Sequence, residues 1–332
     1  MRSRVPQVAV SELHYEEDAL DVVTVVVPSA GKRDQLLHRA LDSIGGQSFE
    51  GPIAVVLVDD SRDGRLSDFG GSRGNAKVSV VPSSTDEAPR WTGVKHARAD
   101  TAWFAFLDDD DWWVPRKLER QVQLALELRT AGHEPVVSCL VDTSGSPDLT
   151  ATGAVPARAI APGQNVAEYL FWRRAPSRRR SSIFTSTILT SRSIALAVPW
   201  RKLPRHQDWD WLVRAGAVPG VAVRHVPEVL VGYAVGSASS ISATPDWQSS
   251  LAWAQSTLRE YAEPAVYADF LASQTLRYAI AARSREGIAK CVREIRMTAG
   301  TPSPSALASG LAGLVSRRYI EAALRGRGRS TR

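Results

Sequence analysis

Four consecutive aspartates, Asp108 to Asp111, are the residues of this chain best suited to chemistry. They follow the apolar run 103–107 and precede Trp112 and Trp113. Clustered carboxylates repel one another unless a cation neutralises them, and oxygen ligands suit a hard divalent ion that also binds phosphate oxygens. An acidic run by itself is more often a hydrated surface loop. Here the preceding run predicts a buried strand, which places the acids at its carboxyl end, where open α/β sheets bind ligands.

Two other segments carry acidic residues that could belong to a site. Asp59 and Asp60 follow the apolar run 53–58, so a second acidic cluster is expected at the same sheet edge. Asp208 opens the segment 208–215, which predicts a short helix with an acidic first turn. Each has a plainer interpretation, since Asp59 and Asp60 are typical turn residues and Asp208 is a preferred N-cap residue.

The elements that must position these acids follow from the pattern of apolar residues. Strand-like runs separated by helix-length segments indicate βαβ units and a mostly parallel sheet, followed by a helical region. We expect an N-terminal extension at 1–20, a catalytic domain at 21–240, a helical region at 241–324 and a basic, disordered tail at 325–332. The predicted strands are 22–27, 53–58, 78–81, 103–107, 136–141 and an extended run at 183–189, and the predicted helices are 37–44, one that begins at Pro115, 208–215, 247–262, 266–283 and 304–324.

The composition excludes several classes of protein. With 332 residues, 44% hydrophobic and 23% charged, the chain is typical of a globular protein. Its N-terminal residues lack the apolar core of a secretory signal, and no run reaches the roughly 18 apolar residues of a spanning helix. Two distant cysteines and six dispersed histidines argue against a disulfide framework or a structural zinc site. We therefore expect a cytoplasmic protein.

The net charge of +6 invites a nucleic-acid interpretation, but the distribution of charge opposes it. Residues 171–180 hold five arginines, residues 316–332 hold six arginines and one glutamate, and the rest of the chain is mildly acidic. We expect no nucleic-acid partner. A solvated loop is the simplest interpretation of the arginines between Arg173 and Arg180, and a flap that meets diphosphate or an anionic acceptor is the alternative hypothesis. For the basic tail, the hypothesis is peripheral contact with anionic lipid.

Five segments, taken in order, resemble the family 2 glycosyltransferases with the GT-A fold. They are Val22–Ser29, Ser43–Ser48, Leu57–Asp63, Phe106–Asp111 and His206–Arg214, and the resemblance covers about residues 20–235. It implies an α/β fold of GT-A type, Rossmann-like, with a mostly parallel sheet flanked by helices and a C-terminal helical extension.

The resemblance also implies a role for each acid. Asp59 would lie at the nucleotide base, Asp108 near the ribose, and Asp110 would bind Mn²⁺ or Mg²⁺, while Asp208 would be the catalytic base. The residues implied in nucleotide-sugar binding are Pro28, Ser29, Asp59, Asp60, Arg90, Asp108 and Asp109. The chain departs from the family pattern at Trp91, where asparagine is usual, at Gln207, where glutamate is usual, and at Ser29-Ala30, which replaces Thr-Tyr-Asn.

These roles imply a metal-dependent, inverting transfer of a sugar, of hexosyl type, from a nucleotide-diphosphate donor to an acceptor hydroxyl. A UDP-type donor is favoured, and polysaccharide, glycolipid and secondary-metabolite acceptors all remain open. The helix dipole is expected to keep Asp208 ionised so that it accepts the proton of the acceptor hydroxyl. The alternatives are a sugar-nucleotide-binding protein without turnover and a sugar nucleotidyltransferase.

Overall fold

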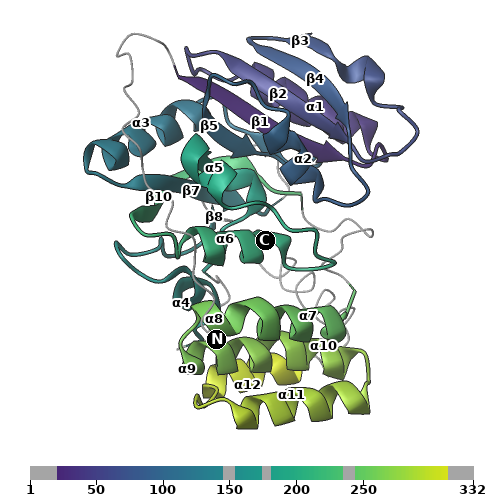
Figure 1. The fold of residues 1–332 in the computed structure, drawn as a ribbon, viewed down its shortest axis with the longest axis vertical. Coiled ribbons are helices and arrows are strands. Elements are labelled where there is room, and N and C mark those ends of the chain that lie inside the picture. Colours follow the sequence, from purple (N-terminus) through teal and green to yellow (C-terminus); the bar gives the residue numbers. More distant parts are fainter. Residues whose placement is uncertain (1–20, 145–153, 174–180, 235–243, 313–332) are drawn as a thin grey trace, which may run out of the picture.

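A computed structural model describes residues 21–144, 154–173, 181–234 and 244–312. The molecule is built in layers, with a twisted sheet at one end and a stack of C-terminal helices at the other (Figure 1). Helix α6 lies between the two layers (Figure 1). Over these residues, no helix combines the length and the apolar character needed to cross a membrane.

The sheet is mixed and has a parallel core. Its strand order is β3-β4-β2-β1-β5-β9-β7-β10-β6, and β8 pairs with β7 outside that path. Parallel pairing joins β4, β2, β1 and β5 into the core, and it also joins β7 to β10. The strands are β1 (Val22–Ser29), β2 (Ile53–Asp59), β3 (Gly71–Arg73), β4 (Ala76–Pro82), β5 (Thr101–Phe106), β6 (Trp112–Trp113), β7 (Glu134–Asp142), β8 (Ala154–Val155), β9 (Leu189–Ser191) and β10 (Val221–Gly232).

Alternation along the strands divides the apolar side chains between two cores. In β5, Trp103 and Ala105 face one core, whereas Phe104 and Phe106 face the other. Helices α1 and α3 cover the first face, and α2, α4, α5 and α6 cover the second together with the C-terminal helices. These helices are α1 (Asp34–Gly45), α2 (Pro89–Lys95), α3 (Lys117–Thr130), α4 (Val166–Phe171), α5 (Arg192–Ala197) and α6 (Gln207–Ala215).

The C-terminal region is helical, as its apolar periodicity predicts. Proline at the first turn and serine caps mark several helix starts, as at Pro264, Ser284 and Ser303. Two π-helical turns, at 254–258 and 271–275, interrupt otherwise continuous helix. The elements are α7 (Trp247–Trp253), α8 (Arg259–Tyr261), α9 (Pro264–Phe270), α10 (Leu276–Ala281), α11 (Arg285–Met297) and α12 (Pro304–Leu311).

The expected fold class is confirmed, with corrections to single elements. The run 183–189 is not an extended strand, because Thr185–Thr187 form a 3-10 turn and only Leu189–Ser191 pair in the sheet. The 12-residue strand β10 was not predicted, since its polar positions interrupt the apolar pattern. The helix predicted over 304–324 ends at Leu311 as an α-helix, and residues 313–324 lie outside the described part. The expected domain division at residue 240 stays a prediction.

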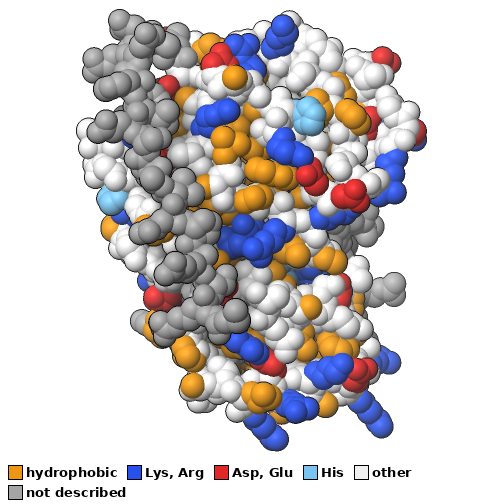
Figure 2. Space-filling model, in the orientation of Figure 1, with side chains coloured by type: hydrophobic (Ala, Val, Ile, Leu, Met, Phe, Trp, Pro, Cys, Tyr) orange, Lys and Arg blue, Asp and Glu red, His pale blue; other side chains and the backbone are white. Residues whose placement is uncertain are grey.

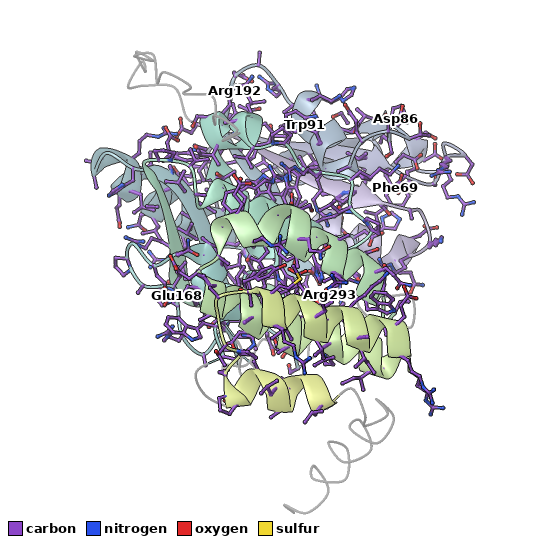
Figure 3. The ribbon with its side chains drawn as sticks, turned by 60° about the horizontal axis from the view of Figure 1, so that its bottom comes forward. Phe69, Asp86, Trp91, Glu168, Arg192 and Arg293 are labelled. Carbon is purple, nitrogen blue, oxygen red and sulfur yellow. The ribbon has the colours of Figure 1, made fainter. Side chains whose placement is uncertain are left out.

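Charge on the surface is uneven. Figure 2 shows Lys and Arg side chains projecting from the end of the molecule formed by the C-terminal helices. A shallow groove of about 530 Å³ lies along α11. Figure 3 places Arg293 on this helical layer, apart from Trp91 of α2. The groove is lined by Arg285, Ile288, Ala289, Val292, Arg293, Arg296 and Met297, none of which is a predicted site residue.

The close packing of α2 on the sheet gives a testable prediction. A Cβ added at Gly93 would lie 2.3 Å from Val26 Cγ1 and 3.1 Å from Val58 Cγ2. Gly93→Ala should therefore lower the free energy of unfolding by about 1–3 kcal/mol, because the added methyl group overpacks the core around α2. The measurement is denaturant titration. Gly70→Ala is the control, since its Cβ would meet nothing nearer than Ser67 O at 3.5 Å. Equal stability of the two variants would contradict this packing argument.

Candidate active site

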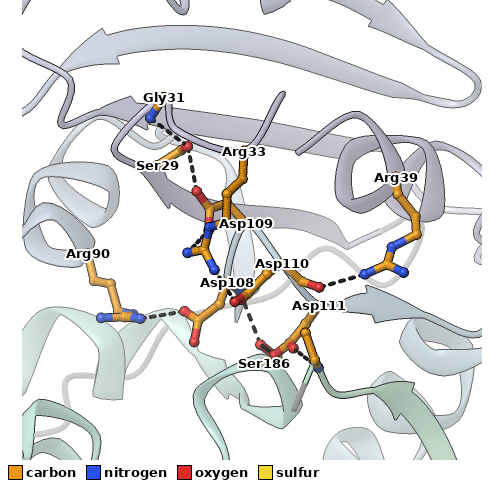
Figure 4. A network of polar contacts seen from close by, with 11 residues as sticks. Ser29, Gly31, Arg33, Arg39, Arg90, Asp108, Asp109, Asp110, Asp111 and Ser186 are labelled. Carbon is orange, nitrogen blue, oxygen red and sulfur yellow. Dashed lines mark hydrogen bonds and ion pairs between the residues drawn. The ribbon is translucent and has the colours of Figure 1, made fainter. Parts of the chain in front are cut away.

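Three strands deliver the predicted site residues to one edge of the sheet. Ser29 ends β1 and lies in register with Asp59, which ends β2. The acidic loop, Asp108–Asp111, follows β5, the other neighbour of β1. Ser29 Oγ donates to Asp109 Oδ2 at 2.7 Å, which ties the first strand to the acidic loop (Figure 4). The structure therefore brings the two acidic clusters together, as the strand pattern predicts.

Two arginines neutralise the exposed side of the acidic loop. Arg33 spans two carboxylates, with Nη2 donating to Asp109 Oδ1 at 2.7 Å and Nη1 donating to Asp110 Oδ2 (Figure 4). Arg90 donates through Nη2 to Asp108 Oδ1. The loop is therefore not a freely hydrated surface run, because its carboxylates have specific cationic partners.

The fourth aspartate turns inward. Asp111 is fully buried and accepts hydrogen bonds from Ser186 Oγ at 2.5 Å and from the Ala234 backbone N–H at 2.9 Å. Ser186 Oγ also accepts from the Asp108 backbone N–H at 3.1 Å. These contacts fix the loop to the 3-10 turn and to the residues after β10. Asp111 therefore holds the loop in place through buried contacts.

Burial dominates the electrostatics of the loop. It raises the pKa of Asp109, of Asp110 and, most strongly, of Asp111, and charges on neighbouring aspartates raise these pKa values further. Arg33 opposes the rise in pKa at Asp109 and Asp110, and the hydrogen bond from Ser186 opposes it at Asp111. A cation that enters the site therefore meets carboxylates whose ionisation costs free energy in its absence.

The tryptophans that follow the acids have separate roles. Trp113 is buried, its Nε1 donates to Ser186 O at 2.9 Å, and Lys117 Nζ lies 3.5 Å from its ring centroid. Burial lowers the pKa of Lys117 to about 7. Trp112 is only partly buried and packs beneath the guanidinium of Arg39, which donates to the Asp110 carbonyl at 2.7 Å. Both tryptophans therefore hold the loop in place.

Asp208 lies in the first turn of α6 but is not its N-cap. The N-cap is His206, a non-glycine residue at φ 64°, and Asp208 is the second residue of the helix. Burial raises the pKa of Asp208, while the Trp209 backbone N–H and Arg90 act in the opposite direction. The N-cap interpretation is therefore wrong. Burial raises the pKa of Asp208 against the effect of the helix dipole, and the expectation that Asp208 is ionised at neutral pH stays a prediction.

Arg90 connects the acidic loop to α6. Besides its ion pair with Asp108, it makes a long hydrogen bond of 3.5 Å to Gln207 Oε1. The charge of Asp108 also contributes to the raised pKa of Asp208. Asp108 and Asp208, which are 100 positions apart in the chain, therefore lie close enough for their charges to interact.

The C-terminal helices hold α6 on both sides of Asp208. The His206 ring stacks on Trp209 with centroids 4.6 Å apart, and its Nε2 lies 3.1 Å from Ser250 Oγ of α7. Burial lowers the pKa of His206 to about 3, so this ring is neutral at physiological pH. Asp210 accepts from Trp253 Nε1 at 3.1 Å and from Arg214 at 2.6 Å. Asp208 is thus carried by a helix whose position depends on the C-terminal region.

The other residues predicted for nucleotide binding differ in their burial and contacts. Asp59 is buried and accepts from the Ser61 backbone N–H at 2.8 Å, so it stabilises the turn after β2. Asp60 is exposed, and Pro28 is half-buried. Their predicted roles in nucleotide binding stay predictions.

Of the arginine cluster at 173–180, only Arg173 is described, and its backbone N–H donates to Asp269 at 2.8 Å. The basic tail lies outside the described residues.

The site has a donor set suited to a divalent cation with diphosphate. Asp108 and Asp110 keep 33% and 18% of their side-chain surface exposed on one loop. Across the described ranges, no cluster of three or more His, Cys, Asp or Glu side chains could hold a metal ion. Mg²⁺ is commonly bound by one or two carboxylates with the other ligands from phosphate and water. The residues fit a cation that arrives with a diphosphate.

Four residues at the site were not predicted from the sequence. Arg33, Arg39 and Ser186 contact the acidic loop directly, and the Tyr233 phenol lies close enough for Asp111, Asp108 and Asp208 to raise its pKa, after burial as the main cause. Only Arg33 had a signal, since it follows Ala30-Gly31-Lys32 after the first strand. Ser186 and Tyr233 reach the loop through tertiary structure.

Comparison with known families identifies the part of the chain that carries the acidic loop. Residues 24–146 match the family model described as glycosyl transferase family 2. The match includes β1, β2, β5 and the acidic loop. The chain therefore carries a glycosyl transferase family 2 domain, as the resemblance of its motifs implies.

Two curated relatives are similar over part of their length. The amylovoran biosynthesis glycosyltransferase AmsB of Erwinia amylovora is 26% identical over 199 residues, which are 58% of this chain and 63% of that protein. The succinoglycan biosynthesis protein ExoW of Rhizobium meliloti (strain 1021) is 32% identical over 100 residues, which are 29% of this chain and 31% of that protein. The chain thus spans less than two thirds of either relative.

Solved structures confirm the fold. The crystal structure of S. aureus TarS 1-349 in complex with UDP-GlcNAc aligns with a TM-score of 0.55 and 14% identity, covering 94% of this chain and 93% of that one. The complex of the same protein with UDP aligns with a TM-score of 0.53 and 15% identity, covering 93% of each chain. The likeness spans both the sheet and the C-terminal helices, and it supports the GT-A fold.

The buried Asp111 gives a prediction about stability and pH. A carboxyl group whose pKa is higher in the folded protein contributes stability below its unfolded value, near 3.8, and loses that contribution as the pH rises through the folded value. Asp111→Asn removes the ionisation, so its stability relative to the parent should increase as the pH rises from about 4. Each tenfold shift in acid dissociation corresponds to about 1.4 kcal/mol.

The measurement is denaturant unfolding of both proteins between pH 4 and 8 in the presence of a chelator. Any packing or hydrogen-bonding cost of the asparagine is independent of pH and leaves the slope unchanged. Asp86→Asn, on an exposed loop, should run parallel to the parent. If the Asp111→Asn curve also runs parallel to that of the parent, the pKa of Asp111 is not raised by folding.

Proposed function

We propose that this protein is a metal-dependent, inverting glycosyltransferase that moves a hexosyl group from a UDP-sugar to an acceptor hydroxyl in polysaccharide biosynthesis. The observation that carries the proposal is the placement of Asp208 beside the acidic loop, joined to it through Arg90 and Asp108. The family 2 match supports glycosyl transfer. The TarS complexes with UDP-GlcNAc and UDP support a UDP-type donor, and the names of AmsB and ExoW support a polysaccharide product.

The reaction needs one group to accept a proton and others to hold the diphosphate. Asp208 accepts the proton of the acceptor hydroxyl while that oxygen bonds to the anomeric carbon and the bond to the diphosphate breaks. Attack from the face opposite the diphosphate inverts the anomeric configuration. The raised pKa of Asp208 strengthens it as a base relative to an exposed aspartate. A divalent cation held by Asp110 would stabilise the negative charge of the departing diphosphate.

Asp208→Asn tests the role of the base. The amide has nearly the same shape but accepts no proton, so transfer should fall on the order of 10²–10⁴-fold, measured by release of UDP with a panel of UDP-sugars and acceptors. Binding of UDP should be nearly unchanged, because Asp208 acts on the acceptor side. Asp86→Asn is the charge-matched control. Full turnover by Asp208→Asn would rule out this base.

Asp110→Asn tests the coupling of cation and nucleotide. For the parent protein, UDP should raise the melting temperature more with Mn²⁺ than with EDTA, because a ligand that binds only the folded state stabilises it by about 2.7 kcal/mol at 100 times its Kd. Asp110→Asn should lose the Mn²⁺-dependent increment and keep the increment seen in EDTA. Equal stabilisation by UDP with and without Mn²⁺ in the parent would contradict the metal-dependent mechanism.

A further inference from the structure

Arg33 pairs with two carboxylates of the acidic loop, and the mechanism proposed above gives it no role. Its guanidinium contacts two adjacent carboxylates of the acidic loop at once, Asp109 through Nη2 and Asp110 through Nη1. The Arg33 side chain is 31% exposed, whereas those of Asp109 and Asp110 are 7% and 18% exposed. A two-pronged pair at a half-buried position is stronger than a surface ion pair, because less of the attraction is screened by water.

The turn after β1 is built to place Arg33 there. Gly31 adopts φ 64°, a conformation that favours glycine, and its N–H donates to Ser29 Oγ at 3.2 Å. A Cβ at Gly31 would lie 2.6 Å from Arg65 Cδ, so the turn is also closely packed. Arg33 then forms the N-cap position of α1. The guanidinium is therefore held above the acidic loop by a short segment that is fixed at both ends.

The two carboxylates differ in what else they contact. Asp109 has both oxygens engaged, Oδ2 by Ser29 and Oδ1 by Arg33. Asp110 is held by Arg33 through Oδ2, and no other side chain among the described residues donates to its carboxylate. The Asp109 carboxylate therefore has a second side-chain partner besides Arg33, whereas Arg33 is the one side-chain partner of the Asp110 carboxylate among the described residues.

A divalent cation and a guanidinium on the same carboxylate repel each other, because both carry positive charge. We propose that Arg33 is an internal competitor of the divalent cation at Asp110. It stays paired to Asp109, leaves Asp110 when the cation binds with the donor, and turns its freed N–H groups toward the diphosphate, a ligand that suits the planar guanidinium. This inference rests on the proposed function for the identity of the cation and the donor.

Binding of Mn²⁺ alone tests the competition without any measurement of activity. The six-line EPR signal of free Mn²⁺ decreases on binding, and it can be titrated for the parent, for Arg33→Gln and for Arg33→Lys. Without a competing charge, Arg33→Gln should bind Mn²⁺ on the order of tenfold more tightly than the parent in the absence of nucleotide. Arg33→Lys keeps a point charge that cannot span both carboxylates, so its affinity should lie between the two.

The matched control is Arg98→Gln, since Arg98 is an exposed arginine that pairs with Asp100. Its Mn²⁺ affinity should equal that of the parent. If the parent binds Mn²⁺ with UDP but Arg33→Gln binds Mn²⁺ alone no more tightly than the parent does, the competition is overturned and the proposed function stands. If neither protein binds Mn²⁺, with or without UDP, both proposals fail. If Arg33→Gln is unfolded by circular dichroism, the comparison of Arg33→Lys with the parent decides, and equal affinities overturn the competition.

Discussion

Repulsion among four adjacent carboxylates is the constraint around which this site is organised. The acids lie at the end of β5, where burial makes the ionisation of Asp109, Asp110 and Asp111 unfavourable. Each acid is compensated by a group from another part of the chain, namely Arg90 of α2, Ser29 of β1, Arg33 of the following turn and Ser186 of the 3-10 turn. The acidic loop therefore draws the surrounding elements together, and its charge is only partly neutralised by the protein. The remaining attraction is available to a cation.

The C-terminal helices contribute to this site through α6. His206 and Asp210 lie on either side of Asp208, and they contact Ser250 and Trp253 of α7. These contacts fix the start of α6 relative to the helical layer, while Arg90 fixes it relative to the sheet. A family match that ends at residue 146 therefore covers the donor side of the site, whereas the proposed base depends on packing that comes later in the chain.

The sequence predicts those features that local patterns determine. Buried strands with acids at their ends are evident in apolar runs that stop at Asp59 and Asp108, so the parallel core and the meeting of the two acidic clusters follow from the pattern. Partners such as Ser186 and Tyr233 have no local signal, because antiparallel insertions bring them to the loop from distant segments. Strand β10 was missed for a related reason, since its pairing with β7 and β6 compensates for a weak apolar pattern. The pKa of Asp208 was also beyond local reasoning, because its direction depends on tertiary burial.

In the proposed mechanism, one side-chain type performs two tasks because the environments differ. The carboxylates of Asp109 and Asp111 accept hydrogen bonds from hydroxyl groups and, at Asp109, from a guanidinium, so their lone pairs are engaged and they are poor proton acceptors. Asp208 is half-buried, but it accepts no side-chain hydrogen bond from any described residue, and Arg90 acts on it only through its charge. No side-chain donor occupies its oxygens, so they can accept a hydrogen bond from an incoming hydroxyl, and its raised pKa favours the transfer of the proton. The same chemistry that makes the loop aspartates suited to a cation thus makes them unsuited to act as the base, and the separation of the two roles is set by their partners.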